Sequence, residues 1–369
     1  MMSKTVNIII AGGKTGGHLF PGIAVAQALE RLHNRTRILF IGTNTPFEIQ
    51  TLEKYGYPHK TIISKPIKGG NIITKAFSAS LILISLIQAM DMIRSFKPDF
   101  ILGMGNFSSF AVVLAGWILG IPTAIQEQNA FPGLTNRLLA RVTGTVFTSF
   151  GDTRGFKKNA KIRYVGNPVR RTEADKASTL LDIEPSAANK KTLLVTGGSQ
   201  GAENINNAFI EALELMENPD AYIVIHQTGI SDEGFIQKKY NALKIPAKAQ
   251  AFFHDMPQLQ AAADLIIARA GAGTISELCL RSKPLILVPY PYAADDHQTH
   301  NARALEDKGA AIMIADKELT GGTLKTAIEK LINNEDRCRA MAANLNKLCM
   351  PDADEKIARY ILSTKDFKG

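Results

Sequence analysis

Residues 7–29 read NIIIAGGKTGGHLFPGIAVAQAL, and this stretch decides the fold class. A short apolar run leads into a glycine-rich loop and then into a helical pattern, which predicts strand, loop and helix in that order. Residues 192–213 read TLLVTGGSQGAENINNAFIEAL and follow the same order. A doubly wound domain carries its glycine-rich loop after its first strand. The repetition therefore predicts an α/β protein with two successive Rossmann-like, doubly wound parallel-sheet domains.

Apolar runs and helical patterns alternate along the rest of the chain as well. This alternation is typical of parallel sheets covered by helices on both faces. We expect strands at 6–10, 37–41, 99–102, 123–126, 145–148, 192–196, 222–226, 264–268 and 285–288, and helices at 21–33, 134–141, 203–216 and 274–281.

The boundary between the domains is expected near VGNPVRR, residues 165–171. The proline disfavours helix there, and few apolar residues follow until about 192. We therefore expect an N-terminal domain at 1–166 and a C-terminal domain at 167–350. The tail contains PDADEKIARYILS at 351–363, which predicts a closing helix.

The 369 residues carry a net charge of +9, which is unevenly distributed. Residues 1–168 contain 19 Lys and Arg against 7 Asp and Glu, whereas residues 169–369 contain 24 against 27. A basic half indicates an anionic partner, which is a nucleic acid, an anionic membrane surface or a phosphate-bearing substrate. The alternative is a basic surface that only aids solubility.

The three cysteines, Cys279, Cys338 and Cys349, belong to no CxxC or Cys/His cluster. This pattern disfavours a disulfide framework and a structural zinc site, and it favours a reducing compartment. The apolar run at 6–10 is too short for a signal-peptide core. The uncharged stretches at 76–90 and 100–126 are too short, or too often interrupted by Gly and Pro, for a membrane span.

Both glycine-rich loops lead into helix starts, whose unpaired N–H groups form anion sites. In GGSQGAEN, residues 197–204, Ser199 and the neighbouring amides are candidates to hold a phosphate. In AGGKTGGHLFPG, residues 11–22, His18 follows the loop at the sheet edge where open α/β folds bind ligands. It is a candidate general base. For each loop the alternative is a tight turn that binds nothing.

Two motifs in the second half also follow expected strands. In ARAGAGTISELCL, residues 268–280, Glu277 lies three positions after Thr274, the spacing of a helix capping box. The functional alternative is a carboxylate that accepts hydrogen bonds from a sugar. The segment VPYPYAADDHQTHNA, residues 288–302, contains many polar side chains but lacks the spacing of a metal site. It is better suited to hydrogen-bonding a neutral polyol, and the alternative is a solvated loop without a ligand.

A further motif, IQEQNAFPGLTNRLLAR at 125–141, belongs to the first half. Glu127, Gln128 and Asn129 follow an expected strand, which places them at the ligand edge of that sheet. The alternative is a capped helix entry.

These motifs, in this order, resemble those of the MurG family, the glycosyltransferases of peptidoglycan synthesis that convert lipid I to lipid II. The matching segments are GGKTGGHLFPG, IQEQN, GNPVR, GGSQGA, GAGTISE and DHQTHNA, spread over residues 11–302. The resemblance implies a GT-B fold, in which two Rossmann-like domains face a cleft. It also implies that the last helix, within 351–369, packs back on the first domain.

The resemblance implies the reaction as well. GlcNAc passes, with inversion, from UDP-GlcNAc to the C4 hydroxyl of MurNAc on an undecaprenyl pyrophosphoryl carrier, and no metal or other cofactor is expected. His18 is expected to be the catalytic base, with Glu127 and Asn129 as orienting groups. The expected substrate-binding residues are Thr15, Gly16, Gly17, Asn129, Arg170, Ser199, Phe253, Ala272, Gly273, Thr274, Ile275, Ser276, Glu277 and Gln298.

Four of these residues have specific expected roles. Glu277 would contact the ribose, Ser199 would lie near the pyrophosphate, and the backbone of Phe253 would contact uracil. Arg170 and the helix starts would stabilise the charge that grows on the departing UDP.

An apolar stretch at 77–87 is flanked by basic residues: Lys65, Lys68 and Lys75 precede it, and Arg94 and Lys97 follow it. Such a patch predicts peripheral binding to an anionic membrane surface, and the family implies the cytoplasmic face of the inner membrane. Other cell-wall synthesis proteins are expected as further partners. The alternative for the helix is burial in the core.

Three other functions compete with this interpretation. A nucleotide-sugar epimerase would bind UDP-GlcNAc without needing a lipid face. A dinucleotide-dependent oxidoreductase would need an acidic residue after the second strand, where the chain has Gly42, Thr43 and Asn44. A nucleic-acid-binding protein would interleave aromatic and basic residues, and no such motif is present, so no nucleic-acid partner is expected.

Overall fold

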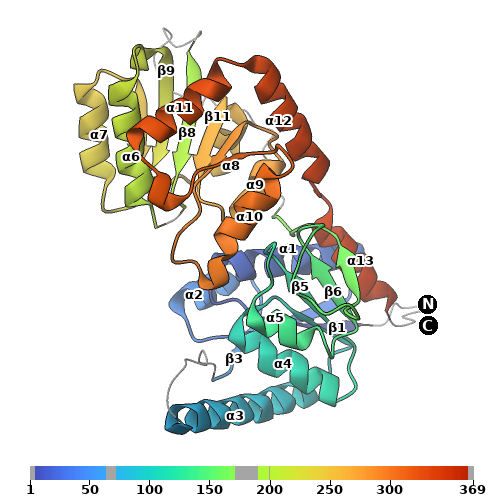
Figure 1. Cartoon of the computed structure of the whole chain (residues 1–369). Helices are drawn as coiled ribbons and strands as arrows, with labels where there is room; N and C mark the ends of the chain where they lie inside the picture. The colour runs from blue at the N-terminus through green and yellow to red at the C-terminus, as the bar shows by residue number, and fades with distance from the viewer. Residues whose placement is uncertain (1–4, 64–71, 171–189, 199, 365–369) are drawn as a thin grey trace. The chain divides into compact units, whose positions relative to one another are not determined.

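The computed structural model describes residues 5–63, 72–170, 190–198 and 200–364, with side chains for all of these except 72–79. The chain divides into two compact units, which are described separately (Figure 1). Unit 1 comprises Met1–Arg171 and Met350–Gly369, and unit 2 comprises Thr172–Cys349.

Unit 1 is built on a seven-stranded parallel sheet. The strand order is β3 (His59–Thr61), β2 (Thr36–Gly42), β1 (Val6–Ala11), β4 (Phe100–Gly103), β5 (Thr123–Glu127), β6 (Thr145–Thr148) and β7 (Ile162–Tyr164). The helices of this unit are α1 (Gly16–Leu32), α2 (Pro46–Lys54), α3 (Ile72–Phe96), α4 (Asn106–Ile118), α5 (Leu134–Leu139) and α13 (Ala353–Ser363).

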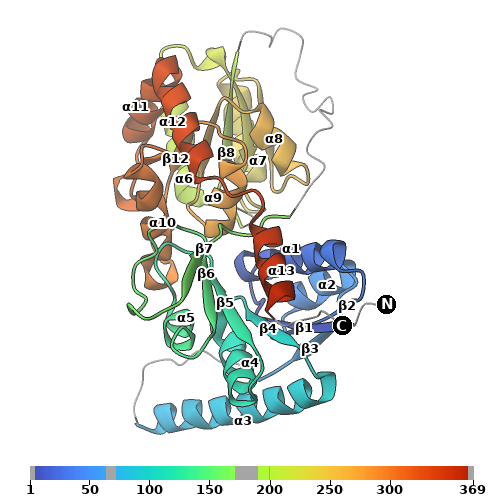
Figure 2. The ribbon, with the colours of Figure 1, turned by 90° about the vertical axis from the view of Figure 1, so that its right-hand side faces the viewer.

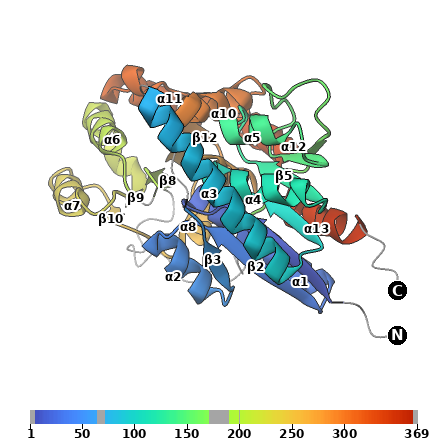
Figure 3. The ribbon, with the colours of Figure 1, turned by 90° about the horizontal axis from the view of Figure 1, so that it is seen from below.

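Successive side chains of β1 point to opposite faces of the sheet and bury two cores. Ile8 and Ile10 join a cluster that includes residues of α1 and α13. Ile9 and Ala11 join a second cluster that includes residues of α3, α4 and α5. Figure 2 shows α13 beside α1, and Figure 3 shows α3 alongside α4. The buried runs read from the sequence therefore mark strands that are covered on both faces.

The C-terminal helix is part of unit 1. Asp354 of α13 is 2% exposed, and its Oδ2 accepts a hydrogen bond from Arg31 Nη2 of α1 at 2.8 Å. Tyr360 lies with its hydroxyl 2.6 Å from Thr145 Oγ1 and its ring edge-on to Phe147. The last helix is therefore anchored to the first sheet by polar as well as apolar contacts.

Unit 2 has a six-stranded parallel sheet. The strand order is β10 (Ala247–Gln250), β9 (Tyr222–Gln227), β8 (Lys191–Thr196), β11 (Leu265–Ala268), β12 (Leu285–Leu287) and β13 (Ile312–Met313). Its helices are α6 (Glu203–Leu215), α7 (Glu233–Ala242), α8 (Met256–Ala262), α9 (Ala272–Cys279), α10 (His297–Glu306), α11 (Gly321–Ile332) and α12 (Glu335–Leu348).

The nine strands expected from the sequence are all present, and the prediction of two doubly wound parallel sheets is confirmed. Two of the predicted helix starts are wrong. The helix α1 begins at Gly16 rather than at Pro21, so the proline lies inside the helix. The helix α9 begins at Ala272 with Gly271 as its N-cap, which places Thr274 inside the first turn. Thr274 and Glu277 therefore do not form the expected capping box.

A buried polar network crosses the interior of unit 2. His226 of β9 is fully buried, with Nδ1 2.6 Å from the Tyr240 hydroxyl and Nε2 2.9 Å from Asn206 Oδ1. Asn206 in turn donates to the Thr228 carbonyl and to Asp232. Burial lowers the pKa of His226 to about 3. The imidazole is therefore neutral in the folded chain.

This buried histidine predicts a specific loss of stability in acid. Below its ordinary pKa of about 6.5, His226 binds a proton in the unfolded chain but not in the folded one. The free energy of unfolding should therefore fall by about 1.4 kcal/mol for each pH unit between 6.5 and 3. In His226→Gln this pH dependence should be absent. Between about pH 7 and pH 5, the free energy of unfolding measured in urea should therefore fall by about 2 kcal/mol more in the wild type than in the variant. Equal slopes would contradict the assignment.

Within the described part of the chain, no helix is both long enough and apolar enough to cross a membrane.

Candidate functional site

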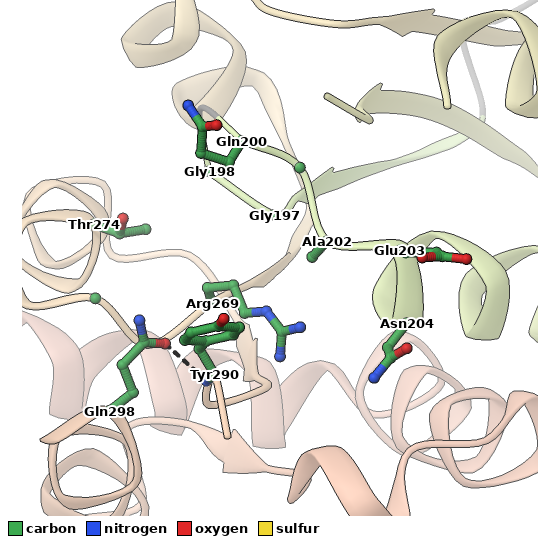
Figure 4. Close-up of a pocket in the computed structure, with 12 residues that line it drawn as sticks. Gly197, Gly198, Gln200, Ala202, Glu203, Asn204, Arg269, Thr274, Tyr290 and Gln298 are labelled. Carbon is green, nitrogen blue, oxygen red and sulfur yellow. Dashed lines mark hydrogen bonds between the residues drawn. The ribbon is translucent and has the colours of Figure 1, made fainter. Parts of the chain in front are cut away.

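A cavity of about 610 Å³ lies in unit 2 at the carboxyl ends of β8 and β11, where the loops lead into α6 and α9 (Figure 4). This is the edge at which open α/β sheets bind ligands, and the two helix starts supply backbone N–H groups. The residues that line it are Gly197, Gly198, Gln200, Gly201, Ala202, Glu203, Asn204, Arg269, Gly271, Thr274, Tyr290 and Gln298.

Close backbone packing holds the glycine-rich loop after β8. Gly201 has a φ of +76°, and a Cβ at this position would lie 2.2 Å from the Thr228 carbonyl oxygen. Only glycine combines that conformation with that approach. Gln227 connects this loop to the loop after β10. Its Nε2 donates to the Gly198 carbonyl at 2.9 Å, and its Oε1 accepts from the Phe253 N–H at 3.1 Å.

Gly201→Ala should therefore destabilise the fold and weaken ligand binding at this loop. The added methyl group meets backbone rather than a flexible side chain, so we expect a loss of about 2–4 kcal/mol in the free energy of unfolding. We also expect at least about tenfold weaker binding, by calorimetry, of UDP-GlcNAc, the ligand that the sequence resemblance implies for this loop. Gly234→Ala in α7 is the matched control, because a Cβ there has no neighbour within 4 Å. Equal behaviour of the two variants would refute this account of the loop.

Arg269 lines the cavity, and its side chain is held by other residues of the protein. Its Nη1 donates to Asp316 Oδ1 at 2.6 Å and to the carbonyls of Val288 and Pro289. The ion pair is largely buried, with side-chain exposures of 11% and 9%. Asp316 also accepts from Asn204 Nδ2 at 2.7 Å. One carboxylate thus joins two residues that line the cavity.

Gln298 is fixed by two backbone donors. Its Oε1 accepts from the Ala270 N–H at 3.1 Å and from the Tyr290 N–H at 2.9 Å. The loops after β11 and β12 are therefore joined through one side chain, and Figure 4 shows its amide nitrogen on the side of Thr274. This arrangement presents an N–H donor of fixed direction.

In unit 1, His18 lies in the first turn of α1 beside the loop after β4. Its Nδ1 lies 2.9 Å from the Met104 carbonyl oxygen and 3.1 Å from Gln128 Oε1. Gln128 Nε2 donates to the same carbonyl at 2.8 Å. Gln128 is 2% exposed and Met104 is fully buried, so the ring is held by a rigid part of the fold.

Glu127, at the end of β5, organises the loop that follows it. Its Oε1 accepts from the N–H and the Nδ2 of Asn129, and its Oε2 accepts from the Gly133 N–H and from Asn136 Nδ2. Burial raises the pKa of Glu127, while these hydrogen bonds act in the opposite direction. All four partners are donors, so the ionised carboxylate is the form that satisfies all of them.

Comparison with known proteins agrees with this architecture. The N-terminal domain model of glycosyltransferase family 28 matches residues 8–148, and the C-terminal domain model matches residues 192–357. The chain is 41% identical to a protein of Geotalea daltonii, in an alignment that covers 95% of this chain and 96% of the relative. It is 38% identical to a protein of Myxococcus xanthus, in an alignment that covers 96% of this chain and 91% of the relative. Both relatives are named UDP-N-acetylglucosamine--N-acetylmuramyl-(pentapeptide) pyrophosphoryl-undecaprenol N-acetylglucosamine transferase.

The chain belongs to the MurG family. The crystal structure of Acinetobacter baumannii MurG superimposes with a TM-score of 0.80 at 29% identity, covering 97% of this chain and all of that one. The resemblance read from the six sequence motifs is confirmed, and so is the GT-B fold class.

The cavity brings together several of the donor-site residues expected from the MurG family resemblance. Thr274, Gln298 and the glycines of GGSQGAEN line it. Ala272 and Ile275 are mostly buried in the same helix start, and Gly273 has open space where a Cβ would be. Ser276 Oγ donates to the Ala272 carbonyl one turn earlier. Glu277 follows on α9, and Ser199 lies outside the described residues.

Phe253 also belongs to unit 2, where it is buried, and the other expected residues of the MurG pattern belong to unit 1. Thr15 is the N-cap of α1, and Gly16 and Gly17 form its first turn. Arg170 donates to the Tyr55 hydroxyl at 2.6 Å, and its guanidinium lies 3.9 Å from the centre of the Phe20 ring. Arg170 therefore lies near the start of α1, in the unit that contains His18.

Sequence reasoning missed several members of this MurG site. Arg269 directly follows β11 in ARAGAG, and its charge at a strand end was the available signal. The role of Asp316 had no such signal, because Asp316 is joined to the cavity through Arg269 and Asn204, which are distant from it in the sequence. Sequence reasoning named Glu127 and Asn129 as the groups that orient His18, whereas Gln128 is the residue of this segment found at the ring.

Among the residues that the structure describes, no three His, Cys, Asp or Glu side chains are grouped as a metal site. In the 288–302 segment, His297 Nδ1 lies 2.7 Å from the Ala294 carbonyl oxygen, and Thr299 Oγ1 donates to Asp296 at 2.7 Å.

Proposed function

We propose that this chain transfers GlcNAc from UDP-GlcNAc to the C4 hydroxyl of MurNAc in undecaprenyl-pyrophosphoryl-MurNAc-pentapeptide, with inversion. It is an N-acetylglucosaminyltransferase of peptidoglycan synthesis that converts lipid I to lipid II. The observation that carries the proposal is its 38–41% identity, over more than nine-tenths of the length, to transferases named for this reaction.

The donor is assigned to the cavity of unit 2. The N–H groups of residues 197, 198 and 200–202 and of the α9 start would bind the diphosphate, since helix starts favour anions. Gln298 and Thr274 would hydrogen-bond the sugar, and Glu277 would accept from the ribose hydroxyls. Phe253 would contact uracil through its backbone. Its N–H already donates to Gln227 Oε1, so uracil would have to share this hydrogen bond or replace Gln227 as its acceptor.

Catalysis is assigned to His18 as the general base. The C4 hydroxyl of the acceptor loses its proton to the imidazole while its oxygen bonds to the anomeric carbon of GlcNAc. The bond from that carbon to the UDP oxygen breaks on the opposite face, which gives inversion. The charge that grows on UDP would be stabilised by the helix starts and by Arg170. Glu127 and Asn129 would shape the acceptor loop.

A UDP-release assay with a lipid I analogue tests this function. We expect UDP to form from UDP-GlcNAc only when the acceptor is present. Acceptor-independent turnover of UDP-GlcNAc would instead support the epimerase alternative.

We also infer that unit 1 binds the cytoplasmic face of the inner membrane as a peripheral protein, where other cell-wall synthesis proteins would be neighbours. Leu83, Ile84 and Ile87 of α3 are 58%, 42% and 53% exposed, although the helix buries Ala89 and Ile93. Trp117 and Ile118 of the adjacent α4 are 50% and 48% exposed. Five large apolar side chains on two packed helices favour membrane contact over burial as the role of this surface.

Lys65 and Lys68 lie outside the described residues, and the side chain of Lys75 is not described, so the membrane prediction is tested on the apolar side chains. Leu83→Ser with Ile87→Ser should reduce binding to anionic vesicles at least about tenfold in flotation, because each side chain loses apolar area that the interface would bury. Leu215→Ser with Ile230→Ser in unit 2 is the matched control, since these side chains are 54% and 87% exposed. Equal binding by both double variants would rule the surface out.

A further inference from the structure

We propose that Gln128 is a positioning residue which, with the Met104 carbonyl, holds His18 with its hydrogen on Nδ1. The nitrogen that takes the proton from the acceptor hydroxyl is then Nε2. This inference rests on the proposed role of His18 as the base and specifies how that base is oriented.

The carbonyl of Met104 decides where the hydrogen lies. A carbonyl oxygen only accepts hydrogen bonds, and it lies 2.9 Å from His18 Nδ1. Nδ1 must therefore carry a hydrogen. In neutral imidazole only one nitrogen does, so the lone pair that accepts a proton is on Nε2.

The same carbonyl decides how the Gln128 amide is oriented. Gln128 Nε2 donates to Met104 O at 2.8 Å, which leaves Oε1 to face His18 Nδ1 at 3.1 Å. The reversed amide would place two oxygens against each other at Met104 and two N–H groups against each other at His18. Met104, Gln128 and His18 therefore have one mutually consistent arrangement of hydrogens.

The backbone beside the ring is equally constrained. Gly105 has a φ of +87°, and a Cβ there would lie 3.2 Å from His18 Cε1 and from Nδ1. The ring thus packs directly on the turn that presents the Met104 carbonyl. If the ring turned over, a carbon would replace Nδ1 at both oxygens and both hydrogen bonds would be lost.

Through this arrangement Gln128 also affects the reaction, which a residue that only packs against the ring would not do. When Nε2 takes the proton, the imidazolium keeps its Nδ1–H bonded to two neutral oxygens, which favours the charged ring. The O–H bond of the acceptor breaks and the Nε2–H bond forms, and water later removes that proton. Gln128 therefore helps His18 before and during proton transfer without touching substrate.

Nitrogen-15 NMR of the histidine-labelled full chain tests the inference, with the His18 signal assigned by its absence in His18→Gln. In the wild type we expect a protonated Nδ1 and an unprotonated Nε2, and this measurement needs no folded variant. In Gln128→Leu the ring keeps one of its two acceptors and is freer to turn away from the Met104 carbonyl. We therefore expect a mixture of tautomers and a fall in kcat of about tenfold, while the KM for UDP-GlcNAc stays unchanged. A wild-type ring protonated on Nε2, or a Gln128→Leu chain with unchanged tautomer and kcat, would overturn the proposal.

Gln126→Leu is the matched control, because Gln126, which lies on β5 two positions earlier, is also buried but donates to Ser149 and Asn167. It should lose similar stability and keep the wild-type His18 tautomer. A tautomer change in this variant as well would mean that loop packing, and not Gln128, sets the ring. If His18→Gln keeps full activity, the base assignment fails instead, independently of Gln128.

Discussion

Replacing His18 by glutamine should lower kcat for GlcNAc transfer by about 10²–10⁴-fold, while the KM for UDP-GlcNAc changes by less than about threefold. The imidazole is the only proton acceptor assigned to the acceptor hydroxyl, and general-base catalysis is lost with it. Glutamine keeps a polar side chain of similar length and can still donate to the Met104 carbonyl. Steady-state kinetics with a lipid I analogue, varying each substrate in turn, measures both constants.

The control for this result is a variant on the donor side. Glu277→Ala should raise the KM for UDP-GlcNAc and leave kcat less affected, because its assigned partner is the ribose rather than the reacting atoms. The reverse pattern, with His18→Gln acting on the KM and Glu277→Ala on kcat, would exchange the two assignments.

Glu127→Ala should lower the free energy of unfolding by about 3–5 kcal/mol. The change leaves the N–H groups of Asn129 and Gly133 and the amide of Asn136 without the acceptor that they share. Each such loss of a partner costs about 1–3 kcal/mol, reduced where the loop opens to water. Glu127→Gln should be destabilising to a smaller extent, because one of its oxygens becomes an NH₂ group that faces donors.

Urea unfolding of the full chain measures the effect of Glu127, and Glu53→Ala is the control. Glu53 is an exposed carboxylate of α2 in the same unit, so its removal should change stability by less than about 0.5 kcal/mol. If Glu127→Ala costs no more than Glu53→Ala, the carboxylate does not organise the loop and a direct role in catalysis becomes the better account.

The sequence predicted the interior strands and missed only strands at sheet edges. The four strands that it did not predict, β3, β7, β10 and β13, are the two outer strands of each sheet. Interior parallel strands are covered on both faces and leave continuous apolar runs, whereas edge strands are short and partly polar. Ile162–Tyr164 of β7, for example, is exposed throughout. Such strands are defined by pairing with a neighbour, which no local pattern reveals.

The sequence predicts those residues of the candidate site that lie in loops directly after strands. It does not predict the contacts that join segments distant in the sequence. The glycines of 197–201, Thr274 and Gln298 could be read from loops that follow strands. The bond from Gln128 to His18 joins residues 110 positions apart, and the Arg269–Asp316 pair spans 47. The helix starts at Gly16 and Ala272 lie before the proline and the threonine that local sequence favours at a helix start.

The measurement that tests the central claim most directly is identification of the product. The purified chain is incubated with lipid I and UDP-GlcNAc carrying carbon-13 in the sugar, and the lipid product is analysed by mass spectrometry and NMR. The account predicts a lipid heavier by one labelled GlcNAc, joined through a β linkage to C4 of MurNAc, with one UDP released per sugar transferred. Unchanged lipid I together with an epimer of UDP-GlcNAc, or a product with an α linkage, would contradict it.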